Sequence, residues 1–220
     1  MKNIAAYIDH TLLKPTALPE DIEKLCKEAM RYHFYAVCIN GCYVKIAKEW
    51  LKNSEVKLAA VVGFPLGQNT ITTKIFEAQE AIENGADEID MVINIPALKT
   101  KNDDFLLDEI GTIKASIGKK VLKVIFENCY LETAEIIRAC EIAVDAGADF
   151  VKTSTGFGTF GATEEQVALM LKTVNKRAKV KAAGGIKNVE EAEKYIKMGV
   201  ERLGTSSGIA IIEGLKVEGY

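Results

Sequence analysis

The chain has 220 residues, enough for one large α/β domain or two small ones, with 48% hydrophobic and 27% charged residues. A net charge of −3 gives no argument for nucleic acid or an anionic membrane surface as partner, and no run approaches the roughly 18 apolar residues that span a bilayer. Five cysteines without a regular framework, and an N-terminus without a signal-peptide pattern, predict a cytoplasmic protein.

Short apolar runs alternate with amphipathic stretches along the whole chain. The runs predict strands at residues 8–12, 36–40, 58–63, 88–93, 121–127, 150–153, 180–183 and 202–205. The stretches between them predict helices, for instance at 21–32, 72–84, 104–117, 133–146, 164–178 and 189–198. Thr163 has the position of an N-cap, with Gln166 completing a capping box, and Gly85, Gly147 and Gly199 follow last helical turns.

Three strand entries resemble one another: "NGADEIDMV", "AGADFVKTS" and "MGVERLGTS". Each is a helix end, a glycine, a short acidic turn and a buried strand. Eight such units predict one (β/α)8 TIM barrel over residues 1–220, with a short N-terminal helical extension. A doubly wound open sheet is the competing fold, although no G-x-G-x-x-G follows the first strand. In a barrel, functional side chains lie at the carboxyl ends of the strands.

Three consecutive strands carry a lysine at a position that faces the barrel interior. Side chains alternate along a strand, so outward apolar neighbours leave Lys123, Lys152 and Lys181 pointing inward. The lysines are equally spaced, one strand–helix unit apart, which predicts that all three reach one interior layer. By the same alternation Asp90 on the fourth strand and Asp9 on the first face inward.

These charges have two interpretations. They are either solvated strand-end charges and internal ion pairs, or a reaction site. Burying such a cluster costs several kcal/mol unless its members pair, and surface charges would not follow the barrel repeat. A lysine crowded by a second ammonium loses its proton more readily, which is what an amine nucleophile requires. The cluster therefore predicts Schiff-base chemistry.

Glycine-rich loops follow the last two strands. Gly184 and Gly185 come after the seventh strand, and "GTSSG", residues 204–208, comes at the eighth. Backbone N–H groups in such loops bind phosphate, and in barrels the loops after strands seven and eight are the usual place. Together they predict a phosphorylated substrate.

Five motifs, "IDHTLLKP", "EIDMVIN", "VKTSTGFG", "KAAGGI" and "GTSSG", resemble those of the deoxyribose-phosphate aldolases. The resemblance runs from about Ile8 to Gly208. It implies a class I aldolase on a (β/α)8 barrel, without metal or organic cofactor. The implied reaction is reversible cleavage of 2-deoxy-D-ribose 5-phosphate to D-glyceraldehyde 3-phosphate and acetaldehyde. Such barrels tend to form homodimers or larger homo-oligomers.

The resemblance also implies roles for individual residues. Lys152 is the Schiff-base lysine, Lys181 its catalytic partner and Asp90 the acid/base carboxylate. The implied phosphate-binding residues are Gly156, Gly184, Gly185, Gly204, Ser206 and Ser207, and the supporting residues are Lys123, Asp9, Thr11, Cys38, Thr155 and Tyr220.

Several of these residues carry a second interpretation. Tyr220 is either a disordered end or a proton donor that reaches back to the enamine, and deleting it would then slow deuterium exchange into acetaldehyde. Cys38 is either a packing residue or a trap for reactive enals, in which case Cys38→Met resists inactivation. His10 is expected to be structural.

Two residues depart from the pattern of this family: Phe160 stands where Gly is expected, and Asn128 stands where Thr is usual. Ala183 stands where Ser or Ala is common. Phe160 is expected to narrow the substrate mouth.

Two other functions remain open. A transaldolase-like or keto-acid aldolase barrel would share the strand lysine but would not need "KAAGG" one unit later. A non-enzymatic phosphate-binding barrel would keep the glycines, but it has no reason to keep three inward lysines.

Overall fold

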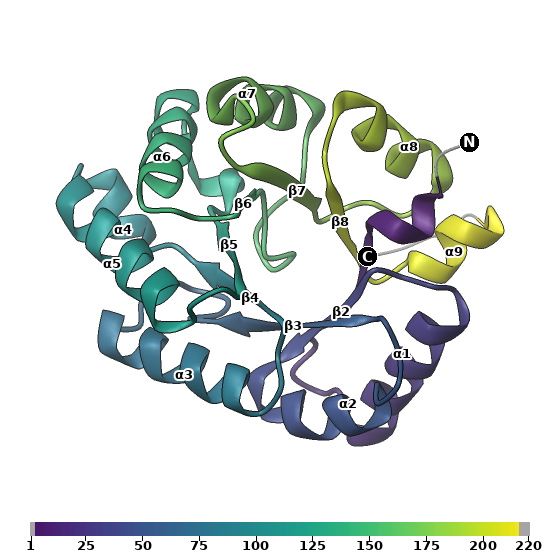
Figure 1. Cartoon of the computed structure of the whole chain (residues 1–220). Helices are drawn as coiled ribbons and strands as arrows, with labels where there is room; N and C mark the ends of the chain where they lie inside the picture. Colours follow the sequence, from purple (N-terminus) through teal and green to yellow (C-terminus); the bar gives the residue numbers. More distant parts are fainter. Residues whose placement is uncertain (1–2, 216–220) are drawn as a thin grey trace.

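The strands close into a barrel. The computed structural model describes residues 3–215, whose strands are parallel, run in the order β1 to β8, and close where β8 pairs with β1. The strands are β1 (Ile8–Leu12), β2 (Ala36–Asn40), β3 (Lys57–Val62), β4 (Glu88–Val92), β5 (Val121–Ile125), β6 (Phe150–Lys152), β7 (Lys179–Ala183) and β8 (Arg202–Thr205). Figure 1 shows the strands as an inner ring surrounded by helices. The predicted TIM barrel is confirmed, and the open sheet is excluded.

Helices follow the strands along the chain. The α-helices are α1 (Pro19–Arg31), α2 (Val44–Trp50), α3 (Ile71–Glu83), α4 (Ile95–Lys99), α5 (Asp103–Ser116), α6 (Thr133–Asp145), α7 (Glu164–Val174), α8 (Val189–Met198) and α9 (Gly208–Glu213). The 3-10 helices are η1 (Ile4–Tyr7), η2 (Gly41–Tyr43) and η3 (Asn128–Tyr130). The first of these, η1, is the short extension expected before the first strand.

Local chemistry sets several element ends. The Thr163 hydroxyl accepts a hydrogen bond from the Gln166 N–H at 3.2 Å, so the predicted N-cap of α7 is confirmed. The same helix ends at Val174, four residues earlier than predicted, because Asn175 has a left-handed backbone with φ 44°. The fifth strand likewise ends before Glu127, whose φ is 55°.

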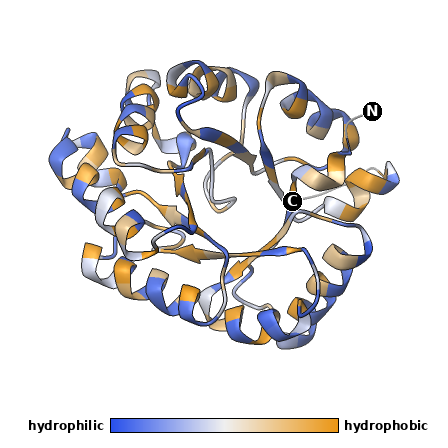
Figure 2. Cartoon of the chain, in the orientation of Figure 1, coloured by the Kyte–Doolittle hydropathy of each residue, from blue (hydrophilic) through white to orange (hydrophobic). Residues whose placement is uncertain are grey.

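A hydrophobic core fills the space between the strands and the helices. On β4, Ile89 and Met91 are fully buried among core residues, while Asp90 between them points to the other face. In Figure 2 hydrophobic and hydrophilic residues alternate along the helices, as expected for helices with one buried face. Among residues 3–215, no helix is both long and apolar enough to span a membrane.

Interior side chains stack in layers, each taken from alternate strands, as in other barrels of this type. The central layer, from odd-numbered strands, contains Asp9, Ala59, Lys123 and Lys181. The upper layer, nearer the carboxyl ends of even-numbered strands, contains Cys38, Asp90, Lys152 and Gly204, and the lower layer contains Ala36, Glu88, Phe150 and Arg202.

The prediction that all three lysines share one layer is therefore wrong. Lys152 pairs with Lys181, but Lys123 pairs with Phe150, two residues before Lys152. The strands are tilted and staggered, so equal spacing along the chain does not give equal height in the barrel. Lys123 and Lys181 lie in the central layer, and Lys152 lies one layer above them.

Candidate active site

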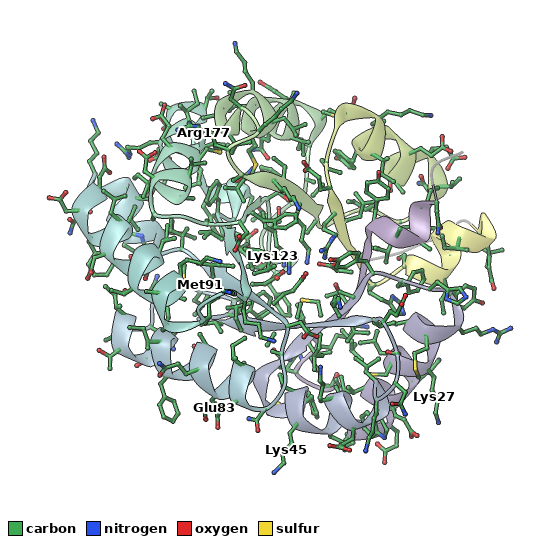
Figure 3. All side chains as sticks on the ribbon, in the orientation of Figure 1. Lys27, Lys45, Glu83, Met91, Lys123 and Arg177 are labelled. Atoms are coloured by element: carbon green, nitrogen blue, oxygen red, sulfur yellow. The ribbon has the colours of Figure 1, made fainter. Side chains whose placement is uncertain are left out.

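The predicted charges meet inside the barrel, away from solvent. Lys123, Lys181, Asp9 and Asp90 are fully buried, and Lys152 is 3% exposed. Figure 3 shows Lys123 within the ring of strands, whereas Lys27 and Lys45 lie on the outer helices. Solvated strand-end charges are thus excluded as the explanation of this cluster.

Asp90 is the meeting point of the three lysines. Its Oδ1 accepts a hydrogen bond from Lys123 Nζ at 2.6 Å. Its Oδ2 accepts from both Lys152 Nζ at 2.8 Å and Lys181 Nζ at 2.9 Å. The stagger of the layers makes this possible, because a carboxylate in the upper layer reaches a lysine beside it and two lysines below.

Asp9 holds the second lysine from the opposite side. Its Oδ2 accepts a hydrogen bond from Lys181 Nζ, and its Oδ1 accepts one from Arg202 at 2.9 Å. Lys123 Nζ is farther away, at 3.9 Å. Lys181 is therefore fixed between two carboxylates, Asp9 and Asp90.

Burial and neighbouring charges act in opposite directions on these groups. Burial alone would raise the pKa of Asp90, but Lys123, Lys152 and Lys181 hold it well below its ordinary value. The pKa of Asp9 is lowered in the same way, by Lys181, Lys123 and Arg202 against burial.

The two lysines of the central layer respond in the opposite sense. Burial would lower the pKa of Lys181, yet Asp9 and Asp90 raise it above its ordinary value. The pKa of Lys123 is also raised, by Asp90, Glu88 and Asp9 against burial and Lys181. Both side chains are thus cations at neutral pH.

Arg202 and Glu88, in the lower layer, extend the charged network downward and were missed by the sequence analysis. Arg202 is 5% exposed, and its two terminal nitrogens donate to the Glu88 carboxylate at 3.2 and 3.1 Å. Lys123 Nζ lies 2.5 Å from Glu88 Oε2. Both residues begin their strands at positions that face the barrel interior, and this alternation is the sequence signal that identifies them.

The wall beside Asp90 is apolar. Cys38 Sγ lies 3.9 Å from Asp90 Oδ2, within a small cluster of interior apolar residues: Leu13, Cys38, Ala59 and Val61, with Phe64 against them. Burial, and then the Asp90 charge, raise the pKa of the Cys38 thiol. Cys38 thus faces the site as predicted, and its thiol form is favoured over the thiolate.

Glu127 fixes the loop after β6, and it too was missed. Its carboxylate accepts hydrogen bonds from both the N–H and the hydroxyl of Thr155, whose Oγ1 in turn accepts from the Phe157 N–H at 3.0 Å. Glu127 is 2% exposed, and burial raises its pKa. Its left-handed backbone could not be read from the sequence, because non-glycine residues seldom adopt it.

The glycine-rich loops close over the same end of the barrel. Gly184 and Gly185 have φ values of 84° and 79°, which favour glycine. A Cβ on Gly161 would lie 2.2 Å from the Gly184 carbonyl carbon, so the loop after β6 touches the loop after β7. Thr205 Oγ1 donates to the Ile186 carbonyl at 2.6 Å and accepts from the Ser207 N–H at 2.9 Å. The two predicted phosphate loops are thus linked.

The remaining predicted phosphate residues have different surroundings. Gly156 has φ 89°, and a Cβ at this position would meet nothing within 4 Å, while Ser206 is exposed. Gly204 lies within β8, where a Cβ would stand 3.1 Å from Lys181 Cε. Gly204 therefore has a packing reason to be glycine besides its predicted role.

Other predicted residues lie around the site. Thr11 donates its hydroxyl to the Asp9 carbonyl at 2.8 Å. The ring of His10 packs against Phe34 outside the barrel, and its Nε2 lies 2.8 Å from Glu28, which fits the expected structural role. Tyr220 lies outside the described residues.

The three residues compared with the family pattern are Phe160, Asn128 and Ala183. Within residues 3–215, none of them forms a hydrogen bond with the lysines and aspartates of the cluster. Phe160 is 42% exposed, Asn128 is buried with its amide nitrogen 3.3 Å from Met170 Sδ, and the Ala183 carbonyl accepts from the Thr153 hydroxyl at 3.0 Å. Within residues 3–215, no three His, Cys, Asp or Glu side chains are grouped to hold a metal ion.

Comparison with known proteins gives consistent matches. The family model described as "DeoC/LacD family aldolase" matches residues 3–214. A deoxyribose-phosphate aldolase of Clostridium novyi is 53% identical, with 98% of each chain covered, and one of Thermococcus gammatolerans is 56% identical, with 97% of each covered.

Solved structures match as well. The putative deoxyribose-phosphate aldolase of Coccidioides immitis superposes with a TM-score of 0.94 at 40% identity, covering 96% of this chain and 85% of the other. The deoxyribose phosphate aldolase of Aeropyrum pernix, described as having a unique tetrameric structure, gives a TM-score of 0.87 at 32% identity, covering 96% and 89%.

Proposed function

The chain belongs to the DeoC/LacD aldolase family, and from this premise we propose that it cleaves 2-deoxy-D-ribose 5-phosphate reversibly to D-glyceraldehyde 3-phosphate and acetaldehyde. Relatives that are 52–56% identical over nearly the whole chain carry the name of this activity. One observation carries the proposal for this molecule. A single buried carboxylate, Asp90, holds Lys152 and Lys181 within hydrogen-bonding distance of one oxygen.

Lys152 is the proposed nucleophile. It is the most exposed of the three lysines, and it stands in the upper layer, nearest the carboxyl ends of the strands. As a free amine its Nζ adds to the C1 aldehyde of the open-chain sugar phosphate, and loss of water gives a protonated imine. The positive charge of this imine forms beside Asp90, whose carboxylate is already in place to stabilise it.

Carbon–carbon cleavage then needs a base. Asp90, acting through a water molecule beside the Lys181 cation, removes the proton of the C3 hydroxyl as the C2–C3 bonding electrons move into the imine. Glyceraldehyde 3-phosphate leaves, and an enamine remains on Lys152. Because three lysines hold the pKa of Asp90 low, this carboxylate passes the proton on rather than keeping it. Protonation at C2 and hydrolysis release acetaldehyde and restore the amine.

Lys181 and Lys123 act as fixed cations in this scheme. The raised pKa of Lys181 keeps it protonated, so it is a fixed positive charge in the layer below Lys152. Lys123 supports Asp90 through its 2.6 Å contact with the other carboxylate oxygen. Asp9 in turn anchors Lys181.

The phosphate of the substrate is proposed to bind at the linked loops after β7 and β8, with Gly156 from the loop after β6 as a further candidate. Gly184 and Gly185, which have positive φ, are the candidate backbone N–H donors, whereas the Ser207 N–H is already bonded to Thr205 and Ser207 would contribute its hydroxyl. The apolar wall of Leu13, Val61 and Phe64 suits the two-carbon fragment that stays on Lys152.

Location and assembly are also proposals. We place the protein in the cytoplasm, since all five cysteines are free thiols. We propose a homo-oligomer, in line with the description of the Aeropyrum pernix relative as a tetramer.

Reductive trapping tests the function. Incubation with acetaldehyde and cyanoborohydride should attach an ethyl group to Lys152, identified by peptide mass spectrometry, and deoxyribose 5-phosphate should be cleaved. Lys152→Leu should lose both, whereas the exposed control Lys45→Leu should lose neither. Trapping without cleavage of the deoxyribose phosphate points to another class I aldolase, and absence of an adduct contradicts Schiff-base chemistry.

A further inference from the structure

A buried arginine and a buried glutamate lie in the lower layer of the barrel, beneath the proposed reaction site. Arg202 donates to both oxygens of Glu88, and its guanidinium lies 3.2 Å from the centre of the Tyr35 ring. The centre of the Phe150 ring lies 5.4 Å from the same guanidinium. The pair does not touch Lys152, and the proposed mechanism does not use it.

Each member of the pair nevertheless binds a group of the central layer. Arg202 donates to Asp9 Oδ1 at 2.9 Å, and Glu88 lies 2.5 Å from Lys123 Nζ. Asp9 holds Lys181, and Lys123 holds Asp90, so both chains of contacts end at the groups around Lys152. The charges form one buried network from the lower layer to the nucleophile.

The formal charges of this network are informative. Three carboxylates, Asp9, Glu88 and Asp90, face three cations besides Lys152, namely Lys123, Lys181 and Arg202. The network is therefore neutral when Lys152 is a free amine and carries one excess positive charge when Lys152 is protonated. A buried excess charge is unfavourable because it is poorly solvated.

Two further titratable groups face Lys152. Cys38 is a buried thiol, whose raised pKa keeps it uncharged at neutral pH. Glu127, beyond the carboxyl end of β5, interacts with Lys152 electrostatically, but it is bonded to Thr155 and belongs to the loop above the network. Neither group contacts Arg202 or Glu88.

We propose that Arg202 and Glu88 are positioning residues whose opposite charges offset each other beneath the network, so that neither charge alone displaces the proton equilibrium of Lys152. The inference rests on the proposed function, since it assigns the pair a part in preparing the Schiff-base lysine. It predicts opposite effects for the two residues. Loss of the Arg202 charge favours protonated Lys152, and loss of the Glu88 charge favours the free amine.

The experiment measures the pH dependence of trapping in four proteins: wild type, Arg202→Gln, Glu88→Gln and the double variant. The amine of Lys152 adds to acetaldehyde, water leaves, and hydride from cyanoborohydride reduces the C=N bond to a secondary amine. The rate of ethylation of Lys152 is followed by mass spectrometry from about pH 5 to 10. Because the reductant has its own pH dependence, each variant is compared with the wild type at the same pH.

Arg202→Gln should move the half-maximal trapping rate to higher pH, and Glu88→Gln should move it to lower pH. A unit charge about 10 Å away, at an effective dielectric constant of about 20, corresponds to a shift of about one pH unit. The double variant restores neutrality and should return to within a few tenths of a unit of the wild type. Arg202→Lys keeps the charge and should not shift the profile.

A structural ion pair without this role would behave differently. Both single variants would lower the unfolding temperature, yet their profiles would coincide with that of the wild type, and that result overturns the inference. Shifts in the same direction also overturn it. If Arg202→Gln fails to fold, the downward shift of Glu88→Gln and its absence in the double variant decide the question. If the wild type forms no adduct at all, the proposed function is wrong. If the wild type forms the adduct but the profiles of the variants coincide with its own, only the inference about Arg202 and Glu88 is wrong.

Discussion

Lys152 and Lys181 share one acceptor atom: their Nζ atoms lie 2.8 and 2.9 Å from the same oxygen of Asp90. The two lysines are directly paired on adjacent strands, and one lies a layer above the other. A nucleophilic amine and a fixed cation are thereby held on one carboxylate. Asp90 is the residue on which this arrangement depends.

Replacing Asp90 by Asn should remove the common counterion of three buried lysines. Cleavage of deoxyribose 5-phosphate should fall at least about 100-fold, the usual scale for losing a general acid–base group. The control Asp108→Asn changes an exposed carboxylate on α5 and should keep full activity. Steady-state kinetics on both variants, with circular dichroism to confirm folding, would contradict the role of Asp90 if the two behaved alike.

The lowered pKa values of Asp90 and Asp9 predict how folding stability depends on pH. A carboxyl group with a folded pKa below its unfolded value of 3.8 stabilises the fold above that value, and the contribution is lost as pH falls through the folded pKa. The free energy of unfolding, measured with urea between about pH 2 and 5, should therefore decrease toward acid. Asp90→Asn should have a shallower slope than Asp108→Asn; equal slopes would count against the assignment.

Gly204→Ala tests how tightly Lys181 is held. The new Cβ would lie 2.9 Å from Ala183 Cβ and 3.1 Å from Lys181 Cε, so the lysine has to move from its place between Asp9 and Asp90. We expect a loss of activity of about tenfold to 100-fold, the scale reported for displacements of about 1 Å at a reaction site. Gly111→Ala is the matched control.

Gly111 lies within α5, where a Cβ meets nothing within 4 Å. Its replacement by Ala should leave activity unchanged and stabilise the protein by up to about 1 kcal/mol, because alanine favours helix more than glycine does. If Gly204→Ala behaves like this control in both kinetics and thermal unfolding, the close packing around Lys181 has no bearing on catalysis.

Glu127→Gln tests the attachment of the loop after β6. Glutamine keeps one acceptor oxygen, but it loses the second oxygen and the negative charge, so its hydrogen bonds with the N–H and the hydroxyl of Thr155 are weaker than those of the carboxylate. We expect KM to rise more than kcat falls, because the loop loses its position while Lys152 keeps Asp90.

Thr155→Val tests the same contact from its other partner, because it removes the hydroxyl that donates to Glu127. The effects of Glu127→Gln and Thr155→Val on kcat/KM should be less than additive in the double variant, since both break one contact. Fully additive effects would show that the two residues act independently.

Much of this site is predictable from residue order alone. Alternation along a strand fixes which side chains face inward, and this was enough to bring Asp90, Lys123, Lys152 and Lys181 into one barrel interior. Their heights were not predictable, because the stagger between strands depends on how the whole barrel closes. The equal spacing of the lysines therefore suggested one layer where the structure has two.

The missed residues have different physical reasons. Arg202 and Glu88 begin their strands, and charged residues at strand starts are usually solvated; their burial depends on partners from β1 and β5, distant in sequence. Glu127 has a backbone conformation that its residue type does not favour, so only the tertiary contacts with Thr155 explain it.

Reductive trapping with acetaldehyde is the most direct test of Lys152 as the Schiff-base lysine. The wild type should form one stable ethyl adduct on Lys152 and none on Lys123 or Lys181, since these are held as cations by Asp90, Asp9 and Glu88. An adduct confined to Lys123 or Lys181, or the absence of any adduct while the protein remains folded, would contradict this assignment.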